Sequence, residues 1–140
     1  MTTFGTAKWQ GGLKDGVGAI STKSGALKDH PYGFVARFEG GPGTNPEELI
    51  GAAHAGCFTM ALSKILGDAG FTATEMNTKA EITLEKQDDG FAITKSHLTL
   101  RAKIPGIDAA KFKELAGMAE KGCPVSKVLN AAISLDAELA

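Results

Sequence analysis

Two cysteines are the residues of this chain best suited to chemistry. Cys57 lies inside the apolar stretch "NPEELIGAAHAGCFTMALSKIL", and Cys123 lies in "GCPVSKVL". A thiolate can be oxidised to a sulfenic acid and can condense with a second thiol, so two cysteines can carry a redox reaction together. A free cysteine also packs like a small hydrophobic residue, and for each of the two this simpler interpretation is open.

The local sequence favours Cys123 as the more acidic thiol. It stands at or just before the N-cap of a helix that begins at Pro124, where free N–H groups favour a thiolate, and Lys121 is nearby. Cys57 is about ten residues inside its helix, beyond the reach of the helix dipole, and burial would raise its pKa. If Cys57 reacts, a cation must be brought to it. His54, one turn earlier, is the local candidate unless it is hydrogen-bonded in the core or at an interface.

Arg37 is the second candidate cation, because it is the single charge in "GFVARF". We expect this segment to be largely buried, and a buried arginine needs a carboxylate such as Glu47 or Glu48. An exposed pair with Glu39 is the alternative. Ten residues of helix between Glu47 and Cys57 correspond to about 15 Å of rise. A site that uses both must therefore be bridged by Arg37 or built across a dimer interface.

The N-terminal third of the chain has to position Arg37. "TAKWQG" and "GVGAIST" predict an antiparallel hairpin, and "PYGFVARF" predicts a third strand. A glycine- and proline-rich loop follows. Asn45 is then expected to cap a helix that begins at Pro46, with Glu47 and Glu48 in its first turn.

The elements that follow must position the cysteines. Apolar residues occur on nearly every face of the helix from 49 to 66, which predicts burial all round, and Gly67 and Gly70 offer places for it to end. "TKAEITLEK" and "FAITKSHLTLRAKI" alternate around "QDDG" and predict a second hairpin. A helix capped by Asp108, a short helix after Cys123 and a strand at "ISLDAEL" complete the chain.

This order of elements predicts an α+β fold with mostly antiparallel sheets around one long central buried helix, in a single domain over residues 1–140. A helix that is apolar on all sides needs more cover than 140 residues readily supply. We therefore expect a homodimer that shares its core.

Composition narrows the classes of partner. Fifteen Lys and Arg against sixteen Asp and Glu give a net charge of −1 without a basic stripe, so nucleic acid is not expected. The apolar run from 49 to 62 is interrupted and too short to span a bilayer, so no membrane partner is expected. The N-terminus lacks a signal-peptide pattern, which predicts a cytoplasmic protein with free, redox-active or metal-binding cysteines. Neither CxxC nor HxxxH spacing occurs, so we expect no metal and no bound cofactor.

Several segments resemble one known family. "PYGFVARFEGGPGTNPEELIGAAHAGCFTMAL", "GFAITK", "IPGIDA" and "AEKGCPVSKVLNAAISLDAEL" are similar to the osmotically inducible protein C (OsmC) group of the OsmC/Ohr family, over essentially the whole chain. The resemblance implies a thiol-dependent peroxidase that reduces organic hydroperoxides more readily than hydrogen peroxide. It also implies an intertwined homodimer in which antiparallel sheets wrap the central helices.

The resemblance also implies roles for four residues. Cys57 in "AGCF" matches the peroxidatic cysteine and Cys123 in "GCPVS" the resolving one, while Glu47 matches the glutamate that holds Arg37. In the implied cycle, Arg37 lowers the pKa of Cys57, the thiolate becomes a sulfenic acid, and a Cys57–Cys123 disulfide forms. An external dithiol, for which the wider family suggests a lipoylated protein, reduces it. The alternatives are a non-enzymatic stress or ligand-binding protein and a thiol redox sensor.

Overall fold

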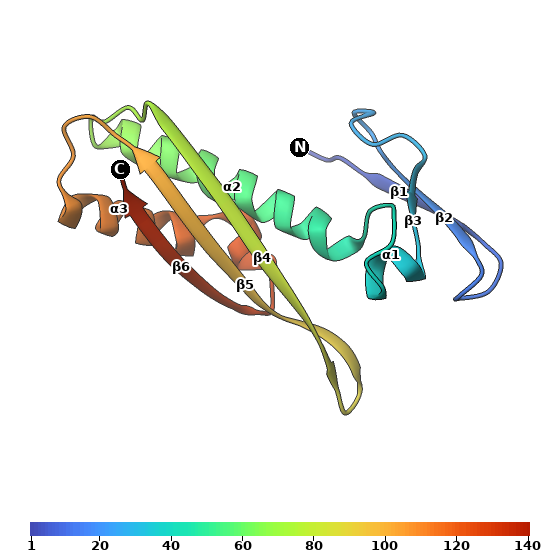
Figure 1. Cartoon of the computed structure of the whole chain (residues 1–140). Helices are drawn as coiled ribbons and strands as arrows, with labels where there is room; N and C mark the ends of the chain where they lie inside the picture. The colour runs from blue at the N-terminus through green and yellow to red at the C-terminus, as the bar shows by residue number, and fades with distance from the viewer. The chain divides into compact units, whose positions relative to one another are not determined.

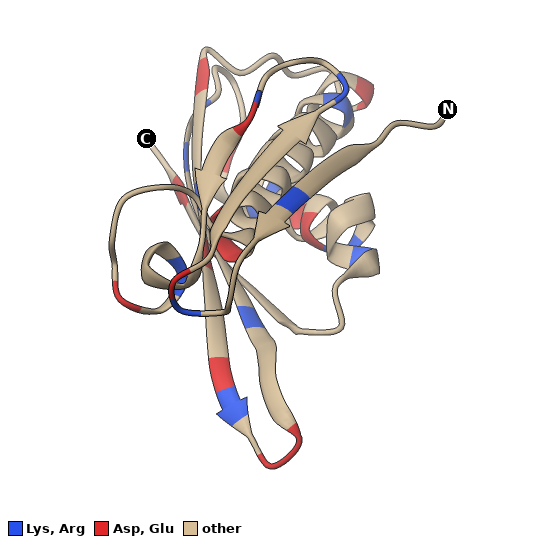
Figure 2. Ribbon diagram, turned by 90° about the vertical axis from the view of Figure 1, so that its right-hand side faces the viewer, with Lys and Arg blue, Asp and Glu red and all other residues tan.

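The computed structural model describes all 140 residues, which divide into two compact units, Met1–Leu49 and Ile50–Ala140 (Figure 1). Lysines and arginines are interspersed with aspartates and glutamates in both (Figure 2). The expectation of one domain over residues 1–140 stays a prediction.

The N-terminal unit contains a small antiparallel sheet. Its strands β1 (Gly5–Gln10), β2 (Val17–Thr22) and β3 (His30–Tyr32) lie in the order β1-β2-β3, which confirms the expected hairpin. The predicted third strand is wrong beyond Tyr32, because Phe34–Phe38 forms the short helix α1. The N–H of Arg37 bonds the carbonyl of Gly33 at 3.0 Å. Phe34 and Phe38, four residues apart, pack their rings at 5.1 Å, a spacing that favours a helical turn over a strand.

This unit buries little apolar surface of its own. Ala36 is its one buried hydrophobic residue, while Phe4, Trp9 and Val17 are 59%, 37% and 69% exposed. A three-stranded sheet needs an apolar face packed against something to be stable. The N-terminal unit therefore leaves several large apolar side chains exposed.

The long helix α2 (Pro46–Asp68) begins where the sequence predicts. The side-chain oxygen of Asn45 accepts the N–H of Glu48 at 2.8 Å, and the hydroxyl of Thr44 donates to the Glu48 carboxylate at 2.6 Å. After Asp68, Gly70 takes a positive φ of 88°, and the N–H of Phe71 returns to the carbonyl of Leu66 at 2.8 Å. These bonds satisfy the last carbonyls of the helix in a Schellman-type ending.

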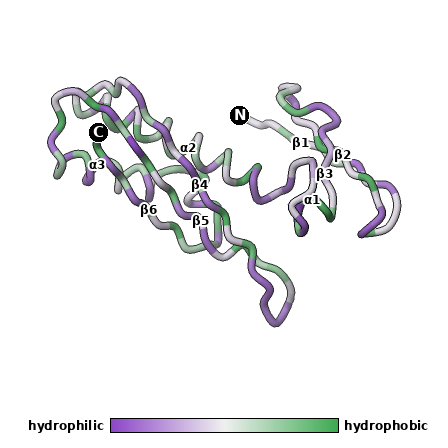
Figure 3. Tube along the Cα trace, viewed as in Figure 1, coloured by the Kyte–Doolittle hydropathy of each residue, from purple (hydrophilic) through white to green (hydrophobic).

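The C-terminal unit is built on a second sheet. Strands β4 (Glu75–Gln87) and β5 (Gly90–Lys103) form the expected antiparallel hairpin, whose connecting turn is strongly hydrophilic (Figure 3). β6 (Ala132–Leu139) lies parallel to β5. Parallel neighbours need a crossover connection, which α3 (Ala109–Gly122) and α4 (Pro124–Val128) supply. The mixed sheet agrees with the α+β expectation of mostly antiparallel strands.

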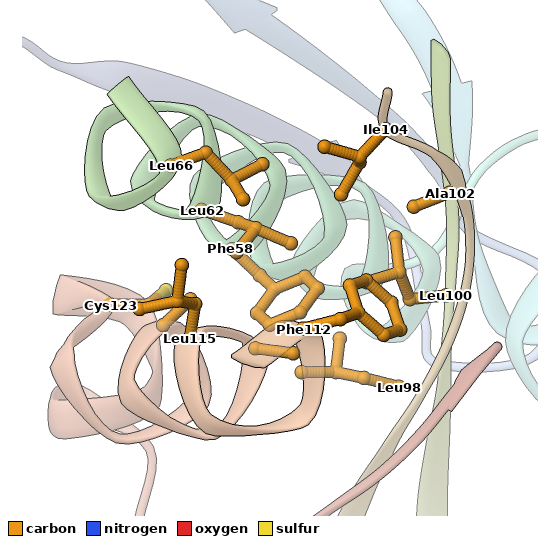
Figure 4. Packing of buried hydrophobic residues seen from close by; sticks show 12 residues of the cluster. Phe58, Leu62, Leu66, Leu98, Leu100, Ala102, Ile104, Phe112, Leu115 and Cys123 are labelled. Carbon is orange, nitrogen blue, oxygen red and sulfur yellow. The ribbon is translucent and has the colours of Figure 1, made fainter. Parts of the chain in front are cut away.

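The core lies between α2, β5 and α3 (Figure 4). Phe58, Leu62 and Leu66 of α2 face it with at most 1% exposure, whereas Met60 on another face is 77% exposed. The prediction that α2 is buried all round is therefore wrong for one chain, in which one face of the helix is covered. The expectation of a short apolar run is also wrong: α2 has 23 residues and, by length and composition alone, is apolar enough to cross a membrane. Its packed face gives it the position of a core helix.

Candidate active site

The two thiols are neighbours in the C-terminal unit. Cys57 is half-buried on α2 and packs against the core cluster that contains Cys123. Cys123 is fully buried between α3 and α4, where it ends one helix and precedes the other. Both carry free sulfur, and a hydrogen bond joins the two side chains. The fold thus brings together residues 66 positions apart in the sequence.

Their shared surroundings move the two pKa values in opposite directions. Burial, the hydrogen bond with Cys123 and repulsion from its charge raise the pKa of Cys57, while the N–H of Val125 lowers it by less. Burial also raises the pKa of Cys123, but hydrogen bonds from Cys57, Ser126 and Val125 outweigh it and leave that pKa lowered. Two of these donors are N–H groups in the first turn of α4. The sequence prediction that Cys123 is the more acidic thiol agrees with this result.

His54 is held in the core. It is fully buried, with Nδ1 2.6 Å from the hydroxyl of Ser96 on β5 and Nε2 2.7 Å from the hydroxyl of Ser126 on α4. Burial lowers its pKa and keeps the ring neutral. The hydrogen-bonded interpretation of His54 is therefore confirmed, and a neutral ring cannot serve as the cation beside Cys57.

Arg37 is fixed by Glu47 in the N-terminal unit. The Arg37 Nε donates to both carboxylate oxygens of Glu47, at 3.1 and 3.2 Å, and Nη2 donates to Oε1 at 2.6 Å. The Glu47 side chain is 11% exposed and that of Arg37 is 37% exposed. Glu47, rather than Glu48 or Glu39, is thus the partner. Nη1 makes none of these three bonds, so that side of the guanidinium can meet a further acceptor.

An apolar pocket adjoins this ion pair within the same unit. Its volume is about 240 Å³. The guanidinium of Arg37 also lies 5.4 Å from the ring centre of Phe38. A cation at the edge of an aromatic pocket suits a ligand with one polar end and one apolar end. The lining residues are Trp9, Leu13, Tyr32, Gly33, Phe34, Arg37, Phe38 and Pro46.

The chain matches the family model described as OsmC-like protein over residues 39–138. It belongs to this family. The matched range includes Glu47, Cys57 and Cys123, and Arg37 lies two residues before it.

Curated relatives and solved structures agree with the family assignment. Peroxiredoxin OsmC of Escherichia coli K12 is 57% identical over 135 residues, which cover 96% of this chain and 94% of that protein. Organic hydroperoxide resistance protein OhrB of Bacillus subtilis is 31% identical, covering 87% of this chain and 88% of that protein. The structure of an organic hydroperoxide resistance protein OsmC from Legionella pneumophila superimposes with a TM-score of 0.74 at 27% identity, over 99% of this chain and 97% of that one.

In this OsmC-like chain the four candidate residues form two pairs. The structure brings Cys57 to Cys123 and Arg37 to Glu47, and each pair lies within one unit.

Sequence reasoning missed the two serines that hold His54. Ser96, Leu98 and Leu100 occupy every second position on the buried face of β5. A serine in line with these leucines is the pattern in the sequence that could have indicated a buried polar contact. Ser126 follows Cys123 by three residues, the spacing that places it in the first turn of the helix beside the sulfur.

Proposed function

We propose that this chain is a thiol-dependent peroxidase that reduces organic hydroperoxides to alcohols, with Cys57 as the peroxidatic and Cys123 as the resolving cysteine. The observation that carries the proposal is the hydrogen-bonded contact of two free thiols inside an apolar core. Two inert core cysteines have no need of opposed pKa shifts or of hydrogen-bond donors around one sulfur. The names of the E. coli and B. subtilis relatives support the same activity.

In the first step, the Cys57 thiolate attacks the terminal oxygen of the hydroperoxide. The O–O bond breaks, the alkoxide leaves and takes a proton to become the alcohol, and Cys57 is oxidised to a sulfenic acid. Because its surroundings in the C-terminal unit raise its pKa, Cys57 requires a cation to form the thiolate. Arg37 is proposed to supply it and to orient the peroxide oxygen, with Glu47 holding the guanidinium in place.

In the second step, Cys123 attacks the sulfur of the sulfenic acid. An S–S bond forms, the S–O bond breaks, and the departing hydroxide is protonated to water. The two side chains are already hydrogen-bonded neighbours, which favours this step. An external dithiol then returns both thiols to the reduced state. We propose a lipoylated protein as this reductant in a reducing cytoplasm, with no bound cofactor, since sulfur carries both electrons.

The pocket beside Arg37 supports an organic hydroperoxide as the substrate. A cavity of about 240 Å³ lined by four aromatic residues can take an alkyl chain, while the guanidinium faces the peroxide end. Hydrogen peroxide has no alkyl part to fill it. The substrate preference is therefore proposed to come from apolar burial.

A homodimer completes the proposal. The N-terminal unit has one buried hydrophobic residue, and α2 exposes Met60 on a face away from the core. In a twofold dimer, the same surface of each copy faces the other copy. A second copy packed there would cover the exposed face of α2 and the exposed apolar residues of the N-terminal unit.

The experiment that tests the peroxidase uses tert-butyl hydroperoxide with reduced lipoamide as the dithiol. Cys57→Ser should abolish turnover, because the attacking sulfur is gone. Cys123→Ser should consume one equivalent of peroxide and then stop, because the sulfenic acid has no resolving thiol. Peroxidase turnover retained by Cys57→Ser would falsify the assignment.

The same experiment separates the competing functions. A ligand-binding protein with inert cysteines would lose no thiol when titrated after one equivalent of hydroperoxide. A redox sensor would form the Cys57–Cys123 disulfide once but would not turn over with excess reduced dithiol. Sustained turnover, with the wild-type disulfide as an intermediate seen by mass spectrometry, would support the enzyme.

A further inference from the structure

His54 is a fully buried titratable group that the proposed cycle leaves without a task. Its ring bridges β5 and α4 through Ser96 and Ser126, at 2.6 and 2.7 Å. Burying an imidazole and two hydroxyls costs free energy unless all three are hydrogen-bonded, as they are here. Packing alone would be served by an apolar residue, so this polar cluster calls for a further role.

Ser126 connects His54 to the resolving thiol. It lies in the first turn of α4, three residues after Cys123, and its N–H and its hydroxyl both hydrogen-bond the Cys123 sulfur. The same hydroxyl is 2.7 Å from Nε2 of His54. One oxygen thus contacts the imidazole on one side and the sulfur on the other.

The direction of the hydrogen bonds follows from counting donors. A hydroxyl has one proton, so when Ser126 donates to sulfur it must accept from the Nε2–H of His54. A neutral imidazole protonated at Nε2 accepts at Nδ1, and Ser96 supplies that proton. Burial, which lowers the pKa of His54, favours this neutral form. Every donor in the series Ser96, His54, Ser126 then points toward Cys123, and successive bonds strengthen one another.

We propose that His54 and Ser126 are positioning residues that orient one hydroxyl donor onto the Cys123 sulfur and so favour its thiolate for disulfide formation. This inference rests on the proposed function, in which Cys123 resolves the sulfenic acid of Cys57. The thiolate attacks that sulfur, the S–S bond forms, the S–O bond breaks, and the released hydroxide takes up the proton that Cys123 had given up, yielding water. No further oxidant or reductant enters this step.

The first test measures the pKa of Cys123 without any peroxide. In a Cys57→Ser background Cys123 is the only thiol, because the chain has two cysteines, and its thiolate can be followed by absorbance at 240 nm. Cys57 is also the titratable group in hydrogen-bond contact with Cys123, so its removal simplifies the titration. Ser126→Ala should raise the pKa by about one unit, the effect of losing one hydrogen bond to a charged acceptor. His54→Gln should raise it by less, and Ser126→Thr should leave it near the parent value.

The chain offers matched controls in a second histidine. His97 on β5 also bridges two polar groups, with Nδ1 2.6 Å from the hydroxyl of Ser134 and Nε2 3.1 Å from the Asp136 carboxylate. His97→Gln and Ser134→Ala, in the same background, should leave the Cys123 titration unchanged. An unchanged titration in Ser126→Ala, an equal shift in Ser134→Ala, or an equal shift in Ser126→Thr would each overturn the inference.

The second test separates this inference from the proposed function. With both cysteines present, Ser126→Ala should form the sulfenic acid of Cys57, trapped with dimedone, at the wild-type rate. Disulfide formation at pH 7 should slow by about tenfold, because a rise of about one unit in the pKa of Cys123 lowers its thiolate fraction by that factor. Absence of both the sulfenic acid and the disulfide in the wild type would contradict the peroxidase alone. Normal sulfenic acid with an undiminished rate of disulfide formation in Ser126→Ala would overturn the positioning role alone.

Discussion

At the scale of residues, the C-terminal unit stabilises the thiolate of Cys123, the proposed resolving cysteine, better than that of Cys57, the proposed peroxidatic one. Hydrogen bonds from Cys57, Ser126 and Val125 lower the pKa of Cys123, whereas burial and the hydrogen bond with Cys123 raise that of Cys57. A thiol that attacks a peroxide has to be deprotonated at the moment of attack. The proposal assigns the missing stabilisation of the Cys57 thiolate to Arg37.

Replacing Arg37 tests whether geometry matters as well as charge. Arg37→Lys keeps the charge but cannot donate from two nitrogens to Glu47 and still face a peroxide. We expect kcat/KM for tert-butyl hydroperoxide to fall by about 10- to 100-fold, less than the roughly 100- to 1,000-fold for outright loss of an aligned donor, because lysine keeps the charge. Arg101→Lys, in a 3.6 Å surface pair with Glu138, is the matched control and should retain the wild-type value. Equal kcat/KM for both variants would refute a positioning role for the guanidinium.

The buried His54 makes the stability of the protein depend on pH. Its pKa is lowered from 6.5 in the folded state, so below pH 6.5 the unfolded chain binds a proton that the folded chain does not. The free energy of unfolding of the wild type therefore falls as the pH falls. His54→Gln lacks this titrating group, so its free energy of unfolding does not fall for this reason. At pH 7.5 the variant should be less stable by about 1–3 kcal/mol, because the buried hydroxyl of Ser96 and the partly buried hydroxyl of Ser126 lose a partner. Urea unfolding should show this gap narrowing by pH 5.5, and a constant gap would contradict the prediction.

At the scale of elements, the two ends of α2 are specified by different means. Side chains of Asn45 and Thr44 fix its first turn, whereas its last turn is closed by backbone bonds that require a left-handed residue. The sequence predicts two possible ends of the helix, at Gly67 and at Gly70. Gly67 lies inside the helix, and Gly70, with φ of 88°, is the residue that ends it.

A pair of glycine substitutions separates these two roles. A Cβ at Gly67 or at Gly70 would meet no atom within 4 Å, so crowding does not distinguish them. Gly67→Ala should stabilise the fold by about 0.5 kcal/mol, since alanine favours a helix. Gly70→Ala should destabilise it by roughly 1–2 kcal/mol, because an L side chain disfavours a left-handed backbone. Urea midpoints that move in the same direction for both variants would count against this account.

The elements also show what a sequence can and cannot specify. The β4–β5 hairpin and the start of α2 were predictable because alternation and capping are local patterns. The apolar segment Phe34–Phe38 is equally compatible with a strand and with a helix. It forms helix α1, in which the rings of Phe34 and Phe38, one turn apart, pack against each other. The partners of His54 come from 42 and 72 residues away, so no local pattern could pair them.

At the scale of the whole molecule, one copy of the chain is incompletely covered. The N-terminal unit buries Ala36 but exposes Phe4 and Val17, and α2 exposes Met60 near its middle. Exposed apolar surface of this kind, on a helix and on a sheet of the same chain, is typical of an interface. The burial all round that the sequence of α2 predicts would then be a property of the homodimer.

This argument predicts a dimer that one charge on α2 can break. Wild-type protein should show twice the 14.5 kDa chain mass by light scattering. Met60→Glu, at a residue 77% exposed in the single chain, should shift the mass toward the monomer, since burying an unpaired carboxylate costs several kcal/mol. Met118→Glu on α3, 51% exposed, adds the same charge outside the α2 face and should leave the dimer intact. A monomeric wild type, or dimers in both variants, would mean that α2 does not form the interface and that its exposed face is covered in another way.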